Sequence, residues 1–442
     1  MNKDLITDRE LGVWVYNIGA DKIWAPPKMG ILKVSNDQER QILNRLAEMM
    51  LFLTRKTDIL YLVAEPDTEF LKDMEIFGIE KPEIRLLPQE LPYHFSEYIA
   101  GSESCRSELK NYLSNMNNDN ALYIPYIVTQ QDEDICKDLR IGLWGAKASI
   151  ARNVNSKVFA RQVALELGFN TTDGFVCSCQ EELEAGYHQL REQGYRYCVI
   201  KEPYGTSGKG VHFIKDEKTF NNLKRLIKFS DSREEFQVVL EGWIEDKTDI
   251  NYQVVITPSG EVRLLMVNEQ LIKQTSYKGT RFPPGISAGQ MDTFSETAEA
   301  IGKHLYQKGY IGILGIDAIV RGNGEIIPVL EFNGRFNQST FYLPIFSQLQ
   351  AWKRQAIIKY YDIRTSEYLD YRRLREYFNL NGKAFSVEEK KGIMIINSSC
   401  LSYSFDESEK SYLSRAFIAI ISEEGKNPED IIAEADSLIK LI

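Results

Sequence analysis

Short apolar runs alternate with amphipathic stretches over the first 145 residues of the chain. Three runs rich in β-branched and aromatic residues predict buried strands at residues 12–19 (GVWVYNIG), 58–66 (DILYLVAEP) and 121–129 (ALYIPYIVT). Between the first two, residues 37–54 (DQERQILNRLAEMMLFLT) carry the spacing of a helix. Strands that alternate with helices predict an α/β unit with a largely parallel sheet.

The pattern changes after residue 155. Residues 156–168 (SKVFARQVALELG) predict a helix that stops at its terminal glycine. Residues 250–272 predict two strands around a Pro-Ser-Gly turn, and residues 312–335 predict a hairpin around a Gly-Asn-Gly turn. A charged segment after residue 365 then leads to a small C-terminal α/β-like unit with the apolar runs GIMIINSS and AFIAIISEEG.

Composition excludes several classes of function. A chain of 442 residues with 43% hydrophobic residues can bury cores in several structural units. Its net charge of -10 argues against a nucleic-acid partner. No apolar run has the length of a signal peptide or a membrane span, so we expect a cytoplasmic protein that does not enter a membrane. The six cysteines and four histidines lack the spacing of a transition-metal site.

A glycine-rich loop lies within residues 199–216 (VIKEPYGTSGKGVHFIKD). It is not a Walker A loop, because Pro203 stands at the earlier glycine position and Gly210 follows the lysine. It is not a dinucleotide fingerprint either, since a strand-like alternation follows it. Two interpretations stay open: a flexible hairpin tip whose N–H groups approach phosphate beside Lys201, and an exposed hairpin with a solvated lysine.

Two later segments favour the phosphate interpretation. The run FQVVLEGWIED, with Glu241 and Ile244, is either an ordinary strand end or a linker whose backbone imitates a base-pair edge for adenine. In the hairpin at residues 312–335, Glu331 and Asn333 are two residues apart and project from one face. Together with Asp317 they offer the oxygen ligands that Mg²⁺ prefers.

A surface hairpin can also alternate acidic and apolar residues. Here, however, the acids lie among apolar neighbours (VLEFNG), where burial of an unpaired charge would cost several kcal/mol. Arg335 continues the face of Glu331 and Asn333 and could neutralise a transferring phosphoryl group. A magnesium site therefore explains this hairpin better than a solvated surface does.

In this order, the segments resemble the ATP-grasp superfamily over about residues 145 to 350. The resemblance rests on Lys157 before a helix, Lys201 with Gly205, Gly208 and Gly210, the linker from Glu241 to Ile244, Asp317, and Glu331-x-Asn333-x-Arg335. It implies an α/β fold, α+β in parts, that comprises a pre-ATP-grasp domain with a parallel sheet (1–145), a small lid subdomain (146–235), a large subdomain (236–365) and a C-terminal extension (366–442).

The resemblance also implies which residues hold ATP and one or two Mg²⁺ ions. The nucleotide would be bound by Lys157, Lys201, Gly205, Ser207, Gly208, Gly210, Glu241, Gly242, Trp243, Ile244 and Asp249. The metal would be bound by Asp317, Glu331 and Asn333. Asp317 departs from the glutamate that is more usual at the first metal position, and its shorter arm could shift or loosen one ion.

The implied activity is a ligation in which a carboxylate attacks the γ-phosphate of ATP. The resulting acyl phosphate is captured by an amine or thiol, with ADP and phosphate released. Such a reaction needs positioning and charge neutralisation more than a nucleophilic side chain. We expect Arg281, with Lys278 and Arg263, to bind the carboxylate and to stabilise the tetrahedral intermediate with Arg335. Alternatively, Lys278 and Arg281 lie in a solvated loop.

The chain is similar to peptide ligases of natural-product pathways, of the pheganomycin type, and to ligases that load an amino acid onto an acyl-carrier protein, as in butirosin assembly. The acceptor is an amine in the first case and a phosphopantetheine thiol in the second. A phosphotransferase and a nucleotide-binding module without turnover remain alternatives. We expect the N-terminal unit to help build the acceptor or carboxylate pocket, and the C-terminal extension to cap the site or form a homodimer contact.

Overall fold

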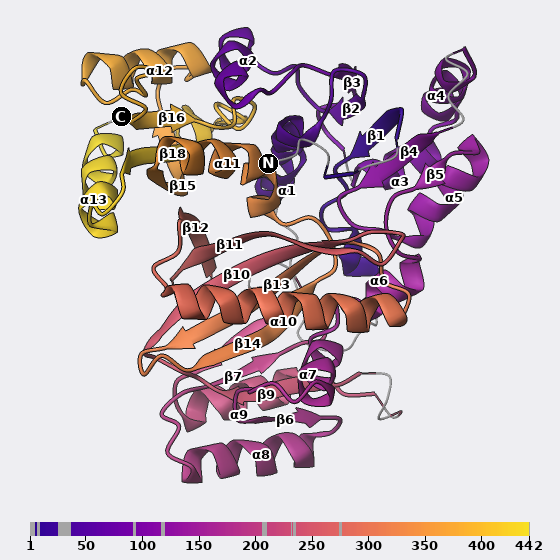
Figure 1. Ribbon diagram of the computed structural model, residues 1–442, viewed down its shortest axis with the longest axis vertical. Coiled ribbons are helices and arrows are strands. Elements are labelled where there is room, and N and C mark those ends of the chain that lie inside the picture. The colour runs from indigo at the N-terminus through magenta and orange to yellow at the C-terminus, as the bar shows by residue number, and fades with distance from the viewer. Residues whose placement is uncertain are drawn as a thin grey trace.

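The computed structural model of the chain contains three β-sheets in the part that it describes (Figure 1). It describes residues 5–6, 9–24, 37–91, 94–115, 120–205, 210–230, 232, 236–273 and 276–441. In Figure 1 the parallel N-terminal sheet lies at the upper right, the smaller antiparallel sheet at the bottom, and the large antiparallel sheet runs between them to the C-terminal strands at the upper left. The α/β fold class, with α+β parts, is confirmed.

The N-terminal sheet has the order β3-β2-β1-β4-β5, and its strands pair in parallel. The predicted strands correspond to β1 (Leu11–Val15), β2 (Ile59–Leu62) and β4 (Ala121–Pro125). Two further strands, β3 (Glu83–Leu86) and β5 (Gly142–Leu143), lie at the sheet edges. Their polar sequence or short length gave no periodic signal.

The helices of this unit are α1 (Asp37–Arg45), α2 (Thr68–Met74), α3 (Phe95–Gly101), α4 (Glu103–Asn115), α5 (Gln130–Leu139) and α6 (Ala148–Val154). The helix expected over 37–54 is α-helical as far as Arg45 and continues as the 3₁₀ helix η2 (Leu46–Leu53). All eight residues of η2 are buried. Because η2 is buried on every side, it lacks the single apolar face on which the prediction of one continuous α-helix relied, and its packing decides its backbone conformation.

The smaller sheet has the order β6-β9-β7-β8 and is antiparallel. Its strands are β6 (Gly174–Cys177), β7 (Cys198–Lys201), β8 (Val211–Ile214) and β9 (Val238–Gly242), so β9 joins this sheet from beyond residue 235. Helices α8 (Gln180–Glu192) and α9 (Glu217–Leu226) pack on it. Helix α7 (Lys157–Glu166), capped by the Ser156 hydroxyl, contacts mainly β14 of the large sheet and, to a smaller extent, β9.

The large sheet has the order β14-β13-β10-β11-β12-β15-β18-β16 and is antiparallel. Its first part contains the two predicted hairpins: β10 (Lys247–Ile256) with β11 (Val262–Lys273), and β13 (Gly312–Arg321) with β14 (Ile326–Asn333). Helix α10 (Ala288–Gln307) packs across β10 and β11. Strand β12 (Ser276–Phe282) then connects this part to the C-terminal strands.

The C-terminal strands continue the large sheet rather than forming a sheet of their own. They are β15 (Arg354–Thr365), β16 (Gly392–Ile395), β18 (Ser411–Glu423) and β17 (Ser404–Asp406), which pairs with β18. Helices α11 (Leu343–Trp352), α12 (Tyr371–Leu380) and α13 (Pro428–Ile439) surround them. The apolar side chains of these elements share one core with those of the N-terminal sheet.

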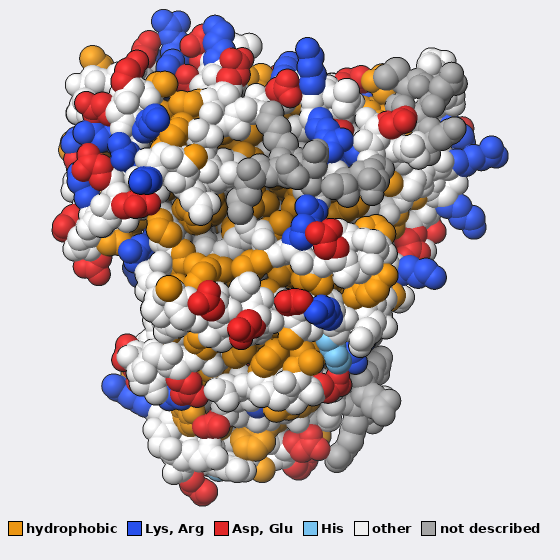
Figure 2. Space-filling model, viewed as in Figure 1, with side chains coloured by type: hydrophobic (Ala, Val, Ile, Leu, Met, Phe, Trp, Pro, Cys, Tyr) orange, Lys and Arg blue, Asp and Glu red, His pale blue; other side chains and the backbone are white. Residues whose placement is uncertain are grey.

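On the face shown in Figure 2, charged side chains of both signs are scattered over the surface. Hydrophobic side chains gather just above α10, over the region where Figure 1 draws β11 and β12. Among the described helices, none combines the length and the apolar character that a membrane span requires.

Candidate functional site

A cavity of about 250 Å³ lies where the three sheets meet. Strand ends and loops from all three contribute to its lining: Tyr16 and Tyr126 from the N-terminal unit, Lys201 and Val211 from the smaller sheet, and Asn251, Gln270, Asp317 and Glu331 from the large sheet. Lys157 at the start of α7 completes one wall. Of the sixteen predicted site residues that the structure describes, nine line this one cavity.

The two acidic residues of the β13–β14 hairpin face each other. Asp317 on β13 is the direct register partner of Glu331 on β14. Burial raises the pKa of Asp317, and the negative charge of Glu331 raises it further. Burial also opposes ionisation of Glu331, but the positive charges of Lys157 and Lys201 outweigh it and lower the pKa of that carboxyl. This pair concentrates negative charge in a desolvated place, which favours a cation beside it.

Three side-chain amides hold the carboxyl group of Asp317. Asn251 Nδ2 and Gln270 Nε2 donate to its Oδ1 at 2.7 and 2.6 Å, and Asn333 Nδ2 donates to its Oδ2 at 3.0 Å. Gln253 in turn donates to Asn251 Oδ1 at 2.9 Å. Neutral donors orient this carboxyl group without neutralising its charge.

Lys157 connects the metal-ligand candidates with the glycine-rich loop. Its Nζ lies 3.2 Å from Glu331 Oε2 and donates to the carbonyl oxygen of Gly205 at 3.3 Å. The side chain is 4% exposed, so its charge is desolvated. A buried ammonium at this position can bind a phosphate oxygen while it stays beside the carboxylate.

Lys201 lies at the end of β7, where its Nζ is 2.6 Å from Glu241 Oε2. Arg161 on α7 pairs with the other oxygen of Glu241 at 3.0 Å. Burial opposes the charge of Glu241, yet Lys201 and Arg161 lower the pKa of the carboxyl. The side chain of Glu241 thus fixes a phosphate-binding candidate, a role that the sequence did not suggest.

The proposed adenine linker, Glu241 to Ile244, begins with the last two residues of β9. Because β9 is hydrogen-bonded to β6 and β7, Glu241 and Gly242 lie in the middle of a sheet. Trp243 lines the cavity, and its backbone N–H donates to the carbonyl oxygen of Tyr197 at 2.9 Å. Ile244 lies just beyond the strand, whereas Asp249 lines the cavity and pairs with Lys247. Adenine binding by this linker stays a prediction.

The glycine-rich loop is described at its two ends. Gly205 lines the cavity, and Gly210 accepts a hydrogen bond at its carbonyl oxygen from the Glu202 N–H at 2.7 Å. The φ angle of Gly210 is 81°, which requires glycine for an unstrained backbone. Ser207 and Gly208 lie outside the described residues.

Arg335 reaches the cavity directly after β14. Its Nη2 donates to Asn333 Oδ1 at 2.5 Å, and its Nη1 donates to the Tyr126 hydroxyl at 3.4 Å. Arg335 therefore lies next to the metal-ligand candidates, with a tyrosine of the N-terminal unit on its other side.

The other cationic candidates lie elsewhere. Arg281 pairs with Glu269 at 3.2 Å, and the two are register partners on β12 and β11. They lie on the face of these strands opposite to Gln270, whose side chain contacts Asp317. Arg263 is near Glu261 at 3.9 Å, and neither arginine lines the cavity. Lys278 lines a second cavity, beside Tyr360. The structure thus brings Arg335 to the nucleotide cavity but does not bring Arg281 or Arg263 there.

The residues present fit a magnesium ion. The donor set consists of two carboxyl groups and an amide from adjacent strands, and hard oxygen donors are what Mg²⁺ prefers. The mutual repulsion of Asp317 and Glu331 indicates that a divalent cation would stabilise their ionised forms. Within the described residues, no group of three histidine, cysteine or acidic side chains suggests a different metal.

Sequence reasoning missed several residues around this cavity. Arg161 lies four positions after Lys157 on a helix, so both lie on one face, and that spacing could have revealed it. Asn251 and Gln270 gave no such signal. Their contact with Asp317 depends on the pairing of β10 with β13 and of β10 with β11.

Comparisons with known proteins agree with this geometry. Residues 198–333 match the family described as L-aspartate–L-methionine ligase, ATP grasp. The chain is 31% identical to the [butirosin acyl-carrier protein]–L-glutamate ligase of Niallia circulans over 335 residues. The aligned region covers 75% of this chain and 74% of that protein.

Two solved structures show the same fold at low sequence identity. The N5-carboxyaminoimidazole synthetase of Staphylococcus aureus, solved with ADP, has a TM-score of 0.54 and 11% identity, covering 97% of each chain. The biotin carboxylase of Campylobacter jejuni, solved as a β-γ-ATP complex, has a TM-score of 0.55 and 12% identity, covering 96% of this chain and 89% of that one. Nucleotide binding is thus typical of the fold.

Proposed function

The chain belongs to the ATP-grasp superfamily of ligases, and from that premise we propose that it activates the carboxyl group of a small acid, such as an amino acid, with ATP and Mg²⁺. The activated acid is then joined to an amine or a thiol, with release of ADP and phosphate. The observation that carries the proposal is the convergence of Lys157, Glu331 and Asp317 on one buried cavity.

In the first step, a carboxylate oxygen of the acid attacks the γ-phosphorus of ATP. The bond from that phosphorus to the β,γ-bridging oxygen breaks, and ADP leaves. We assign Lys157 and Lys201 to the nucleotide phosphates, because both are desolvated ammonium groups on rigid elements that line the cavity. Glu241 and Arg161 hold Lys201 in place.

In the second step, the nucleophile attacks the carbonyl carbon of the acyl phosphate, the carbon–oxygen bond to phosphate breaks, and the nucleophile loses a proton. Arg335 is assigned to the negative charge that develops on the carbonyl oxygen and on the departing phosphate. Its contacts with Asn333 and Tyr126 orient the guanidinium group.

Asp317, Glu331 and Asn333 would hold Mg²⁺, which supplies charge neutralisation for the phosphates when it is bound. The amides of Asn251 and Gln270 keep the Asp317 carboxyl group oriented toward the cavity. In this assignment the protein contributes positioning and electrostatics rather than a covalent nucleophile.

Two acceptors are supported by different findings. The matched family description names a ligase of two amino acids, which favours an amine acceptor and a peptide product. The relative from Niallia circulans is named as a ligase of glutamate to an acyl-carrier protein, which favours a carrier-bound thiol. Either reaction would serve the biosynthesis of peptides or other natural products.

The test supplies ATP, Mg²⁺ and a panel of amino acids with amine, peptide or carrier-protein acceptors. ADP and phosphate that appear only with a matching acid and acceptor would support the proposal, and mass spectrometry would identify the product. Formation of pyrophosphate and an acyl adenylate would contradict the mechanism, and absence of ADP across the panel would remove its support.

A further inference from the structure

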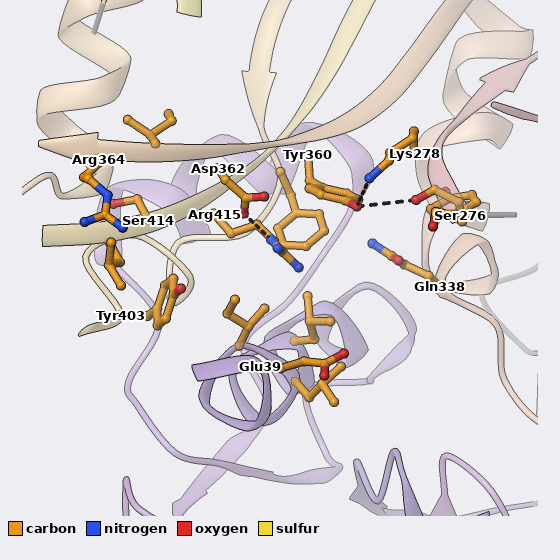
Figure 3. A pocket seen from close by; sticks show the side chains of 17 residues that line it. Glu39, Ser276, Lys278, Gln338, Tyr360, Asp362, Arg364, Tyr403, Ser414 and Arg415 are labelled. Atoms are coloured by element: carbon orange, nitrogen blue, oxygen red, sulfur yellow. Dashed lines mark hydrogen bonds and ion pairs between the residues drawn. The ribbon is translucent and has the colours of Figure 1, made fainter. Parts of the chain in front are cut away.

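A second cavity, of about 560 Å³, lies beside the nucleotide cavity (Figure 3). Its walls come from α1 and η2 of the N-terminal unit, from β12, and from β15 and β18 of the C-terminal strands. Four side chains line both cavities: Leu43, Leu46, Tyr277 and Gln338. The second cavity therefore adjoins the site of the proposed chemistry without containing its residues.

Two cations flank the ring of Tyr360 in this cavity. The guanidinium carbon of Arg415 lies 4.6 Å from the ring centroid, and Lys278 Nζ lies 5.5 Å from it. Lys278 also donates to the Tyr360 hydroxyl at 3.3 Å. Figure 3 shows Arg415 extending into the cavity from β18, with Lys278 approaching Tyr360 from β12.

Much of the hydrogen-bonding capacity of Arg415 is uncommitted. Its Nε donates to Asp362 Oδ1 at 2.6 Å, and no described residue accepts a hydrogen bond from either of its Nη groups. The side chain is 25% exposed, so the guanidinium group is largely shielded from solvent. The N–H bonds of these two Nη groups lie in one plane, which is suited to a carboxylate or phosphate group.

The other charged residues of this cavity limit which ligand fits. Arg364 is already paired with Asp406 and Glu409, so it adds little free positive charge. Glu39 projects from α1 on the opposite wall (Figure 3). Its carboxylate places negative charge on that wall, which does not suit a triphosphate.

We propose that this second cavity binds the non-nucleotide substrate through an oxyanion held between the Nη groups of Arg415 and the Nζ of Lys278. The inference rests on the proposed ligase function and specifies where its second ligand lies. The shared chemistry is a single oxyanion on an extended molecule. It is either the carboxylate of an amino acid or the phosphate of a phosphopantetheine arm, whose other end could reach the nucleotide cavity past Tyr277 and Gln338.

The test titrates the full chain with L-glutamate in one arm and with 4′-phosphopantetheine in the other, by isothermal calorimetry. We expect Arg415→Gln to weaken the binding of one probe at least tenfold, and Lys278→Met to weaken the same probe. Arg415→Lys should lie between the wild type and Arg415→Gln, because it keeps the charge and loses the fork. Arg373→Gln, an exposed arginine paired with Glu367 in the same part of the chain, is the matched control.

A loss confined to L-glutamate identifies the carboxylate, and a loss confined to 4′-phosphopantetheine identifies the phosphate. Failure of both probes to bind the wild type, or unchanged binding to Arg415→Gln, would overturn the proposal. Affinity for a non-hydrolysable ATP analogue is measured in parallel and should not change in Arg415→Gln. If the wild type did not bind the ATP analogue, the ligase function would be contradicted. Probe binding that depends on Arg415 would still support the second cavity as a ligand site.

Discussion

Lys157 and Glu331 form an ion pair, with Nζ and Oε2 3.2 Å apart, although one begins α7 and the other lies near the end of β14. The pair joins a phosphate-binding candidate to a metal-ligand candidate in a single desolvated contact. Removal of either partner would leave a buried charge without its counter-ion, which is more costly than loss of an exposed pair. The predictions for this site therefore need readouts that separate folding from function.

Replacement of Glu331 by Gln should abolish Mg²⁺-dependent ADP formation, with a loss of at least about a hundredfold. The amide keeps the shape of the side chain but loses the charge that a divalent cation requires. ADP release is measured over a range of Mg²⁺ concentrations. Glu325→Gln is the matched control, because Glu325 lies in the same hairpin and pairs with Arg321 away from the cavity. Wild-type turnover in Glu331→Gln would disprove the metal assignment.

Replacement of Lys201 by Ala should weaken both ATP binding and the fold. Glu241 is 5% exposed and would keep Arg161 as its one charged partner, beside a hydrogen bond with Thr172, so we expect a loss of about 3 kcal/mol in the free energy of unfolding. The double variant Lys201→Ala/Glu241→Gln should recover part of that stability but none of the ATP affinity. Urea unfolding and nucleotide titration measure the two effects. Unchanged ATP affinity in the single variant would favour the interpretation of the glycine-rich loop as an ordinary hairpin with a solvated lysine.

Asp132 should make the stability of the N-terminal unit depend on pH. Burial raises the pKa of this carboxyl from 3.8 to about 6, despite hydrogen bonds from Ser96, Thr129 and Asn17. Because the folded-state pKa lies above the unfolded one, the favourable contribution of the protonated form is present below about pH 4 and is lost as pH rises through 6. The expected decrease in the free energy of unfolding is about 3 kcal/mol over the whole range, of which about 2 kcal/mol falls above pH 4.5.

The measurement compares urea unfolding of the wild type and Asp132→Asn between pH 4.5 and 7.5. The variant has a lower unfolding free energy at every pH, because its amide N–H groups face other hydrogen-bond donors. It has no carboxyl group at this position that could titrate. As pH rises, the unfolding free energy of the wild type should therefore fall relative to that of Asp132→Asn. A constant difference across this range would contradict the raised pKa.

The sequence predicted those parts of the fold in which a local pattern decides the structure. The strands β1, β2 and β4, helix α7 and the two hairpins follow from periodicity and turn residues. Within the hairpin, the two-residue spacing of Glu331 and Asn333 anticipated their shared face. The membership in the ATP-grasp superfamily was likewise recognisable from the order of short motifs.

The rest depends on contacts between distant segments. Gln270 contacts Asp317 through the pairing of three strands, and Arg415 and Lys278 both reach Tyr360 through the pairing of β12, β15 and β18. No local pattern encodes such pairings. For the same reason Arg281 looked like a substrate ligand from its neighbours in sequence, whereas its strand register directs it toward Glu269.

Glu48 should link the stability of the N-terminal unit to that of the C-terminal strands. This buried carboxylate accepts hydrogen bonds from the backbone N–H groups of Ser398 and Ser399 at 2.7 and 2.8 Å, and from the Ser398 hydroxyl. Glu48→Ala would leave those N–H groups buried without an acceptor, at a cost of about 2 to 5 kcal/mol. Glu48→Gln should cost less, since one acceptor oxygen remains.

Urea unfolding monitored by tryptophan fluorescence measures both variants, with Glu424→Ala as an exposed control in the C-terminal part of the chain. Because the two units share one apolar core, Glu48→Ala should lower the unfolding midpoint of both together. If instead the C-terminal strands alone unfolded earlier, with the N-terminal transition unchanged, the link through Glu48 would not be the contact that makes the two units fold as one.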